Sequence, residues 1–184
     1  PAAESVGLFN VSGELMTNVT DPHLPQGCEA HRGTLLHFLE DPGNEPKPAA
    51  GSVALFEDGL LILHQGKVLV AGDANEWLNR LPESTPVTHW KDQLILPGFI
   101  DTHVHMPQLG VMASYGAQLL DWLETYTFPH EARFSDIDWA RAEASRFTDL
   151  LLRYGTTSGL VFCTSHSESV HALFEAGEQR GMAL

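Results

Sequence analysis

The sequence predicts an α/β fold in two parts: a β-rich region over residues 1–94, and alternating strands and helices over residues 95–184. Two observations support this prediction. Short apolar runs separated by turn residues fill the first part, which is typical of antiparallel sheets. In the second part, strand-like and helix-like apolar patterns follow each other, as in the β-α-β units that build a parallel sheet.

Apolar runs predict the first strands at residues 6–9 and 33–39. Residues 40–48 contain three prolines and predict a surface loop, because neither a helix nor a central strand accepts them. Residues 51–72 predict consecutive hairpins in a β-meander.

The two hairpin turns of this meander are placed at Asp58-Gly59 and Gln65-Gly66, since glycine supplies the positive φ of tight turns. Residues 74–81 then predict a short helix that ends before Pro82.

In the second part, residues 94–105 are expected to end as an alternating strand entered through Pro97-Gly98, and residues 118–126 predict a short helix. A long helix is expected over residues 134–154. Ser135 is its expected N-cap, and Gly155 ends it.

Residues 158–163 predict a buried strand, which residues 167–180 follow as an amphipathic helix stopped by Gly181. Residues 182–184 begin a third strand. Because strands and helices alternate, we expect a parallel sheet whose catalytic groups lie at the carboxyl ends of the strands.

Composition and charge limit the kinds of partner that the protein is expected to bind. The 184 residues are 43% hydrophobic and 18% charged, which is enough for an ordinary core. Lys and Arg number 10 against 24 Asp and Glu, for a net charge of -14. This charge repels phosphate and anionic lipid, so we expect neither nucleic acid nor a membrane as partner.

No signal peptide or spanning segment is recognisable, which predicts a cytoplasmic protein whose Cys28 and Cys163 are free thiols.

The strongest chemical signal is Asp101-Thr102-His103-Val104-His105 at the end of a predicted strand. Side chains alternate along a strand, so His103 and His105 face the same way with Cα atoms about 6.6 Å apart. Two imidazoles at this spacing can bind one metal ion, although a chance pair of solvated histidines has the same pattern. Asp101 faces the same side, where it either orients a ligand or has a structural role.

Other residues were weighed as further ligands. His166 follows the second strand of the β-α-β pattern, so ligation and loop support are both open to it. We expect His130 and His171 to be surface residues, and Arg141, Arg146 and Arg153 to face water. The histidines of the β-rich region are not expected to be functional: His23, His31, His37, His64 and His89. Motifs for dinucleotides, the P-loop, the nucleophile elbow and cytidine-type deaminases are missing from the sequence.

One ten-residue stretch resembles the first barrel strand of the metal-dependent amidohydrolase superfamily: Leu96-Pro97-Gly98-Phe99-Ile100-Asp101-Thr102-His103-Val104-His105. Within the superfamily the chain is similar to the guanine-deaminating family. The segments that carry this likeness are residues 105–108, 115–123, 126–129, 155–157, 32–38 and 57–61.

The resemblance implies a TIM-type (β/α)8 barrel, of which residues 95–184 are the first strands and helices. It also implies a β-rich, sandwich-like subdomain over residues 1–94, completed by later residues. An eight-stranded barrel takes about 250 residues, so we expect the chain to be the N-terminal portion of a longer protein.

The resemblance further implies zinc-dependent hydrolysis of guanine to xanthine and ammonia by a homodimer. His103 and His105 would be metal ligands, and His105, Met106, Pro107 and Gln108 would line the substrate pocket. The Gln108 amide offers a donor and an acceptor to a base edge, or alternatively caps a loop. The remaining ligands and the general acid/base are expected beyond Leu184, and no catalytic residue is assigned within the chain.

Three alternatives remain open. Another amidohydrolase acting on a different heterocyclic ring would carry the same histidine motif. A metal-binding relative without catalysis would also carry it. Iron or another divalent ion can replace zinc, because imidazole accepts several metals.

Overall fold

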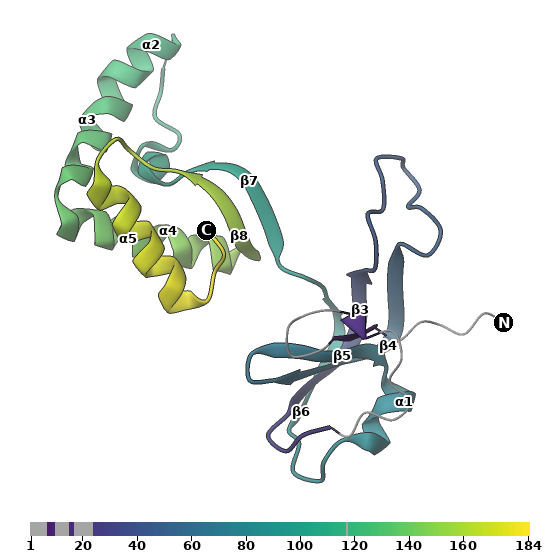
Figure 1. Ribbon diagram of the computed structural model, residues 1–184. Coiled ribbons are helices and arrows are strands. Elements are labelled where there is room, and N and C mark those ends of the chain that lie inside the picture. The colour runs from purple at the N-terminus through teal and green to yellow at the C-terminus, as the bar shows by residue number, and fades with distance from the viewer. Residues whose placement is uncertain (1–6, 10–14, 17–23, 117) are drawn as a thin grey trace. The chain divides into compact units, whose positions relative to one another are not determined.

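A computed structural model describes residues 7–9, 15–16, 24–116 and 118–184 (Figure 1). The chain divides into two compact units, Pro1–Pro97 and Gly98–Leu184. Within the described ranges, no helix has the length and apolar character needed to cross a membrane.

The described residues of the N-terminal unit form one sheet of six strands in the order β2-β1-β5-β4-β3-β6. Neighbouring strands are antiparallel except β3 and β6, which are parallel. The strands are β1 (Gly7–Phe9), β2 (Leu15–Met16), β3 (Glu29–Phe38), β4 (Val53–His64), β5 (Lys67–Asp73) and β6 (Val87–Ile95). The predicted β-rich region is confirmed, as is the irregular loop over residues 40–48.

β6 was not predicted from the sequence. Its first eight residues are exposed and polar residues are interspersed among them, so the strand has neither an apolar run nor a regular alternation. It forms through main-chain pairing with β3, for example between Ala30 and Val87.

One of the two predicted hairpin turns is confirmed. Gln65 and Gly66 join β4 to β5 with φ values of 51° and 73°, both positive as a tight turn between antiparallel strands requires. The turn predicted at Asp58-Gly59 is wrong, because both residues lie inside β4. Gly59 faces Gly33 of β3, and a Cβ atom on Gly59 would lie only 2.5 Å from the Cβ of Leu35. Here glycine permits a close approach of two strands at a shift in register.

The core of this unit forms where the sheet meets a short helix. α1 (Ala74–Trp77) continues into a 3₁₀ turn, Leu78–Arg80, which confirms the predicted helix. Trp77 packs with the fully buried side chains of Leu60, Ile62 and Val70. Cys28 joins the same cluster, and both cysteines of the chain are free thiols, as expected.

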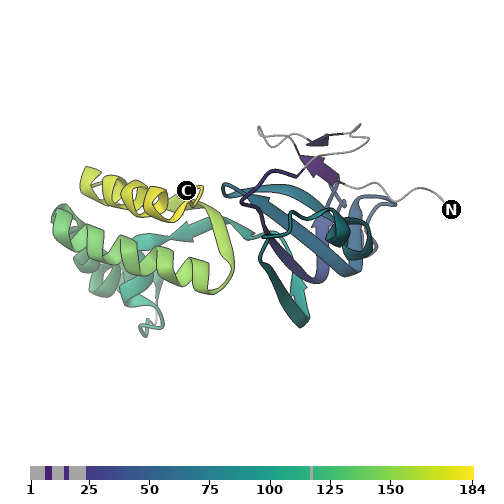
Figure 2. The same ribbon diagram turned by 90° about the horizontal axis from the view of Figure 1, so that it is seen from below.

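In the C-terminal unit, β7 (Phe99–His105) and β8 (Thr156–Phe162) are parallel, and α4 (Ile137–Arg153) connects them. α5 (Ser167–Arg180) follows β8 and lies beside α4 (Figures 1 and 2). Ala183 then pairs with Ser158 in parallel. The predicted β-α-β-α-β order is therefore confirmed.

The strand predicted at the end of residues 94–105, entered through Pro97-Gly98, is β7, whereas Leu94 and Ile95 are the last residues of β6. Residues 96–98 between them belong to neither, because Pro97 lacks the N–H that strand pairing needs. β8 is not buried on both faces as predicted. Gly159 and Val161 face the helices, whereas Leu160 and Phe162 on the other face are 67% and 48% exposed.

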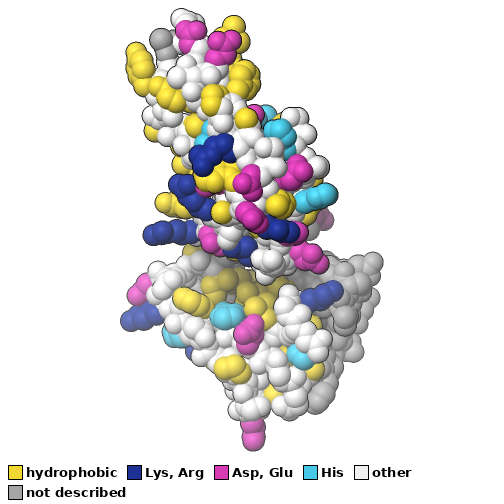
Figure 3. Space-filling model, turned by 90° about the vertical axis from the view of Figure 1, so that its left-hand side faces the viewer, with side chains coloured by type: hydrophobic (Ala, Val, Ile, Leu, Met, Phe, Trp, Pro, Cys, Tyr) yellow, Lys and Arg dark blue, Asp and Glu magenta, His cyan; other side chains and the backbone are white. Residues whose placement is uncertain are grey.

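The helix predicted over residues 118–126 is part of a longer, irregular helical arm. The arm consists of α2 (Leu119–Trp122), a π turn (Leu123–Thr127), α3 (Phe128–Glu131) and a 3₁₀ turn (Ala132–Ser135). Figure 3 shows hydrophobic side chains around the upper end of this unit, where Figure 1 labels α2. Leu119 and Leu120 of α2 are 69% and 71% exposed, whereas Trp122 and Leu123 are half-buried.

The N-cap of α4 is Asp136 rather than the predicted Ser135. The Asp136 carboxylate accepts hydrogen bonds from the backbone N–H groups of Asp138 at 2.9 Å and Trp139 at 3.3 Å. The Ser135 hydroxyl instead donates to the carbonyl of Ala132 in the preceding turn. Ser135 is the last residue of the 3₁₀ turn, so the N-cap of α4 lies one residue later than predicted.

α4 and α5 pack through small residues and two ion pairs. Ala140, Ala144, Ala172 and Ala176 are buried between larger core side chains. Arg141 binds both carboxylate oxygens of Glu175, at 2.8 and 3.1 Å, and Arg180 binds Asp149 at 2.8 Å. Arg141 is exposed, as predicted, and its ion pair with Glu175 also links the two helices.

Candidate active site

The two histidines of the predicted metal motif meet at the carboxyl end of β7. The Nε2 atoms of His103 and His105 lie 3.2 Å apart, and their ring centroids 5.2 Å apart. Two nitrogens bound at 2.0–2.1 Å to one tetrahedral ion are separated by roughly 3.3 Å. The two imidazoles therefore have the spacing of neighbouring ligands on one metal ion.

Asp101 supports the pair through the backbone. Its carboxylate accepts a hydrogen bond of 3.0 Å from the N–H of His103. The pairing of β7 with β8 shifts register between Asp101 and Val104, at the residues that this bond spans. The contact that Asp101 makes is therefore structural: it fixes the main chain of His103, a candidate ligand.

Phe162 was missed as a site residue by the sequence analysis. It pairs with His105 across the parallel strands, and its ring centroid lies 4.7 Å from both imidazole centroids. It is stacked on His105 at an interplanar angle of 11°. The available signal was topological: once β7 and β8 are neighbours in parallel, their last residues must lie side by side.

The predicted substrate segment follows His105 directly in a 3₁₀ segment, Met106–Val111. Met106 is fully buried in the core with Phe134 and Phe147, and Pro107 is also buried. Gln108 is only half-buried, and its Nε2 donates to the carboxylate of Glu131 at 3.5 Å. The segment is thus anchored by its first two residues, while the third is half-buried.

The other histidines are not gathered at this pair. His130 is half-buried rather than on the surface: its ring packs edge-on against Phe134 and Trp139, and its Nε2 is buried without a hydrogen-bond partner. His171 is exposed on α5, as predicted, and His166 precedes α5 as its N-cap residue.

In the N-terminal unit, His37 is buried and stacked on Phe56, whereas His31 accepts a hydrogen bond from the Trp90 indole. His23 lies outside the described residues.

Two ligands do not complete a catalytic metal site. No cluster of three or more His, Cys, Asp or Glu side chains suited to a metal occurs among the residues that the structure describes. A catalytic zinc usually takes three protein ligands and leaves one position for water. The described residues therefore supply a pair of ligands that fits a metal in chemistry and spacing.

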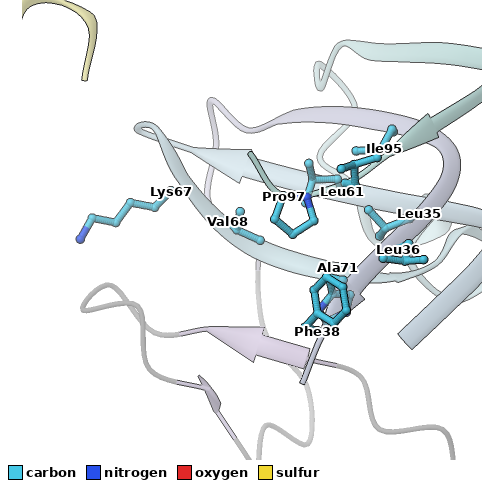
Figure 4. Close-up of a pocket in the computed structure, with 11 residues that line it drawn as sticks. Leu35, Leu36, Phe38, Leu61, Lys67, Val68, Ala71, Ile95 and Pro97 are labelled. Atoms are coloured by element: carbon cyan, nitrogen blue, oxygen red, sulfur yellow. The ribbon is translucent and has the colours of Figure 1, made fainter. Parts of the chain in front are cut away.

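One hollow lies within the N-terminal unit, on its sheet (Figure 4). It measures about 640 Å³, and its lining includes Leu35, Leu61, Ala71, Ile95 and Pro97. His37 lines it as well, and burial lowers the pKa of this imidazole. The lining is almost wholly apolar and contains no pair of catalytic groups, so we do not assign the chemistry to it.

Known proteins match this chain in both sequence and structure. Residues 94–184 match the model of the amidohydrolase family. Guanine deaminase of Escherichia coli is 41% identical over 156 residues, which are 85% of this chain and 35% of that protein. Its solved structure superposes with a TM-score of 0.76, covering 84% of this chain and 35% of the other.

Two further solved guanine deaminases are similar. The enzyme from Bradyrhizobium japonicum is 35% identical with a TM-score of 0.76, covering 84% of this chain and 33% of its own. The enzyme from C. acetobutylicum, solved with guanine bound in its active site, is 25% identical with a TM-score of 0.64, covering 85% of this chain and 35% of its own.

The chain thus spans about a third of the length of the relatives it matches. The predicted fold class is confirmed: the two parallel strands with their helices are part of an amidohydrolase barrel, and a β-rich unit precedes them. With the paired histidines at a strand end and a family match across the C-terminal unit, the chain belongs to the amidohydrolase family.

Proposed function

We propose that the protein to which this chain belongs hydrolyses guanine to xanthine and ammonia. The observation that carries the proposal is the Nε2 pair of His103 and His105, 3.2 Å apart and followed within three residues by the half-buried Gln108. The similarity to guanine deaminases spans both units of the chain and so includes this arrangement.

His103 and His105 would hold a divalent metal through their Nε2 atoms. Zinc fits best, because it favours neutral imidazole ligands and has no geometric demand that a strand-end pair cannot meet; iron and other divalent ions also accept imidazole. When bound, such an ion lowers the pKa of water enough to make hydroxide available near neutral pH. The further ligands are proposed to come from the part of the protein beyond this chain, given the greater length of the relatives.

The reaction replaces the exocyclic amino group of guanine with an oxo group. Water adds to the ring carbon that bears the amine, the carbon–nitrogen bond breaks, and nitrogen leaves as ammonia after it gains a proton. Within this chain, the roles proposed for this step are binding and orientation. The general acid/base is assigned to the remainder of the protein.

Gln108 is the residue of this chain best suited to recognise the base. Its amide carries both a donor and an acceptor, which matches the mixed edge of a purine. We propose that His105 and the backbone of Met106 and Pro107 line the same pocket. The buried Met106 and Pro107 side chains would hold the segment in place.

We also propose how the N-terminal sheet is completed and how the protein assembles. The sheet of residues 1–94 would be completed by later parts of the protein, so that its apolar hollow is covered. A cytoplasmic homodimer is expected from the sequence and from the family resemblance.

The test uses the full-length protein, meaning this chain together with the further length that its relatives have. Purified, zinc-loaded protein is incubated with guanine, and the products are identified by mass spectrometry together with an ammonia assay. We expect xanthine and ammonia in equal amounts, and none from a His103→Ala variant. Folded, metal-bound protein that leaves guanine unchanged but deaminates another ring, such as a pyrimidine or triazine, would reject the substrate assignment.

A further inference from the structure

The Met106–Val111 segment is held from outside by two consecutive side chains of α3. His130 covers Gly110 so closely that a Cβ atom there would lie 2.4 Å from the imidazole Cε1. Its neighbour Glu131 accepts the hydrogen bond from Gln108 at 3.5 Å. Two neighbouring residues of α3 thus contact Gly110 and Gln108 of this segment.

α3 is itself well anchored. The His130 ring packs against Phe134 and Trp139, and the Arg133 guanidinium lies 3.4 Å above the Trp139 ring centroid. Phe134 is fully buried in the core of the unit. The position of Glu131 is therefore set by the core and does not depend on the contact with Gln108.

Glu131 also faces the strand-end side of the unit. It lines a hollow of about 200 Å³ together with Phe128, Ala132, Thr164, Ser165 and His166. Residues 164–166 come directly after β8, as Gln108 comes shortly after β7. Glu131 thus lies between the segments that follow two neighbouring parallel strands, on the side where such folds place their active sites.

We propose that Glu131 is a positioning residue that fixes the orientation of the Gln108 amide toward the substrate. This inference rests on the proposed function. A glutamine amide can turn over and exchange its NH₂ and carbonyl positions, so alone it does not define a hydrogen-bond pattern. An ionised carboxylate only accepts hydrogen bonds, so Glu131 holds the NH₂ group toward itself. Gln108 then presents its carbonyl oxygen and its second N–H in one fixed order.

At 3.5 Å the contact between Gln108 and Glu131 is long for a charge-assisted hydrogen bond. Substrate that binds the Gln108 carbonyl and the second N–H would be favoured only in the orientation that Glu131 selects.

The test is a double-mutant cycle in the full-length, metal-loaded protein, with Glu131→Gln, Gln108→Ala and both together. Glutamine at 131 keeps size and shape but can either donate or accept, so it no longer selects one orientation. We expect Glu131→Gln to raise KM for guanine about tenfold while kcat changes less than about threefold. In the Gln108→Ala background, Glu131→Gln should have no further effect. The matched control is Glu124→Gln, an exposed glutamate of the same arm, which should leave both constants unchanged.

A second readout does not depend on activity. In protein labelled with ¹⁵N-glutamine, the side-chain NH₂ signals of Gln108 are assigned by their loss in Gln108→Ala. We expect Glu131→Gln to shift these signals and Glu124→Gln to leave them in place. Equal KM values for wild type and Glu131→Gln, or equal effects of Glu131→Gln in both backgrounds, would overturn the inference. If Glu131→Gln shifts the Gln108 signals but the wild-type protein leaves guanine unreacted, the substrate assignment is rejected, and with it the role of Glu131 toward guanine.

Discussion

Within the site, residue positions two apart on one strand share a face. His103 and His105 face the same way because side chains alternate along β7, and their Nε2 atoms lie 3.2 Å apart. Asp101 has the same parity, yet its carboxylate turns back to the main chain of His103. Equal spacing therefore placed three polar residues on one side without giving them equal roles.

Loss of either histidine should abolish metal binding. Removing an imidazole ligand costs more than removing a group that merely supports one, which typically weakens a metal site 10–100-fold. We therefore expect His103→Ala to lower zinc affinity of the full-length protein at least about 100-fold, as measured by competition with a chromophoric chelator. His171→Ala, an exposed histidine of α5, is the control and should bind zinc as the wild type does. Unchanged affinity in His103→Ala would exclude the pair as ligands.

Single side chains also decide where helices begin. The sequence predicted Ser135 as the N-cap of α4, although the neighbouring Asp136 also fits the usual preference. The structure uses Asp136, because Ser135 already closes the 3₁₀ turn that links α3 to α4. Which of two good caps is used depends on the path of the preceding segment, which the local sequence does not specify.

This difference predicts unequal effects of two neighbouring substitutions on the helix. Asp136→Ala removes the hydrogen bonds to Asp138 and Trp139 and should lower the free energy of unfolding by about 1 kcal/mol. Ser135→Ala should change it by less than about 0.5 kcal/mol, as an exposed substitution normally does. Urea denaturation of both variants provides the comparison. A larger loss for Ser135→Ala would mean that the cap has been assigned to the wrong residue.

Among the elements, the helices and strands with strong apolar periods were predicted best. α5 follows its predicted range, and Gly181 ends it in the left-handed conformation with φ of 65°. β6 escaped prediction because it is formed by pairing and has no buried face among the described residues. The Asp58-Gly59 turn was misplaced because glycine serves two purposes in sheets, and only the partner strand distinguishes a turn from a close approach.

At the scale of the whole molecule, stability should fall in acid in two stages. Burial lowers the pKa of His37, so the folded state holds this imidazole neutral while the unfolded state protonates near pH 6.5. The stabilisation is complete above that pH and is lost as the pH falls below it. The Arg32 guanidinium lowers the pKa of Asp58, so this contribution is lost only at still lower pH, as the carboxylate is protonated.

The first stage can be isolated with His37→Phe, which removes the titrating group and keeps a ring against Phe56. Wild type should lose up to about 1.4 kcal/mol of unfolding free energy for each pH unit just below 6.5, and the variant should lose less. Urea denaturation at pH 7.5 and 5.5 measures the difference. His171→Gln is the control for a solvated histidine. If wild type and His37→Phe have the same pH dependence, His37 is not held neutral.

Some features of this protein follow from its sequence, and others depend on the tertiary structure. Periodicity and motif spacing were sufficient for the two-part fold class, the parallel β-α-β order and the shared face of His103 and His105, because these depend on regular side-chain patterns along single elements. The contacts of Phe162 with the imidazoles, of Glu131 with Gln108 and of His130 with Gly110 join residues 20 or more positions apart. Such contacts depend on how separate elements pack, and only the tertiary structure decides that.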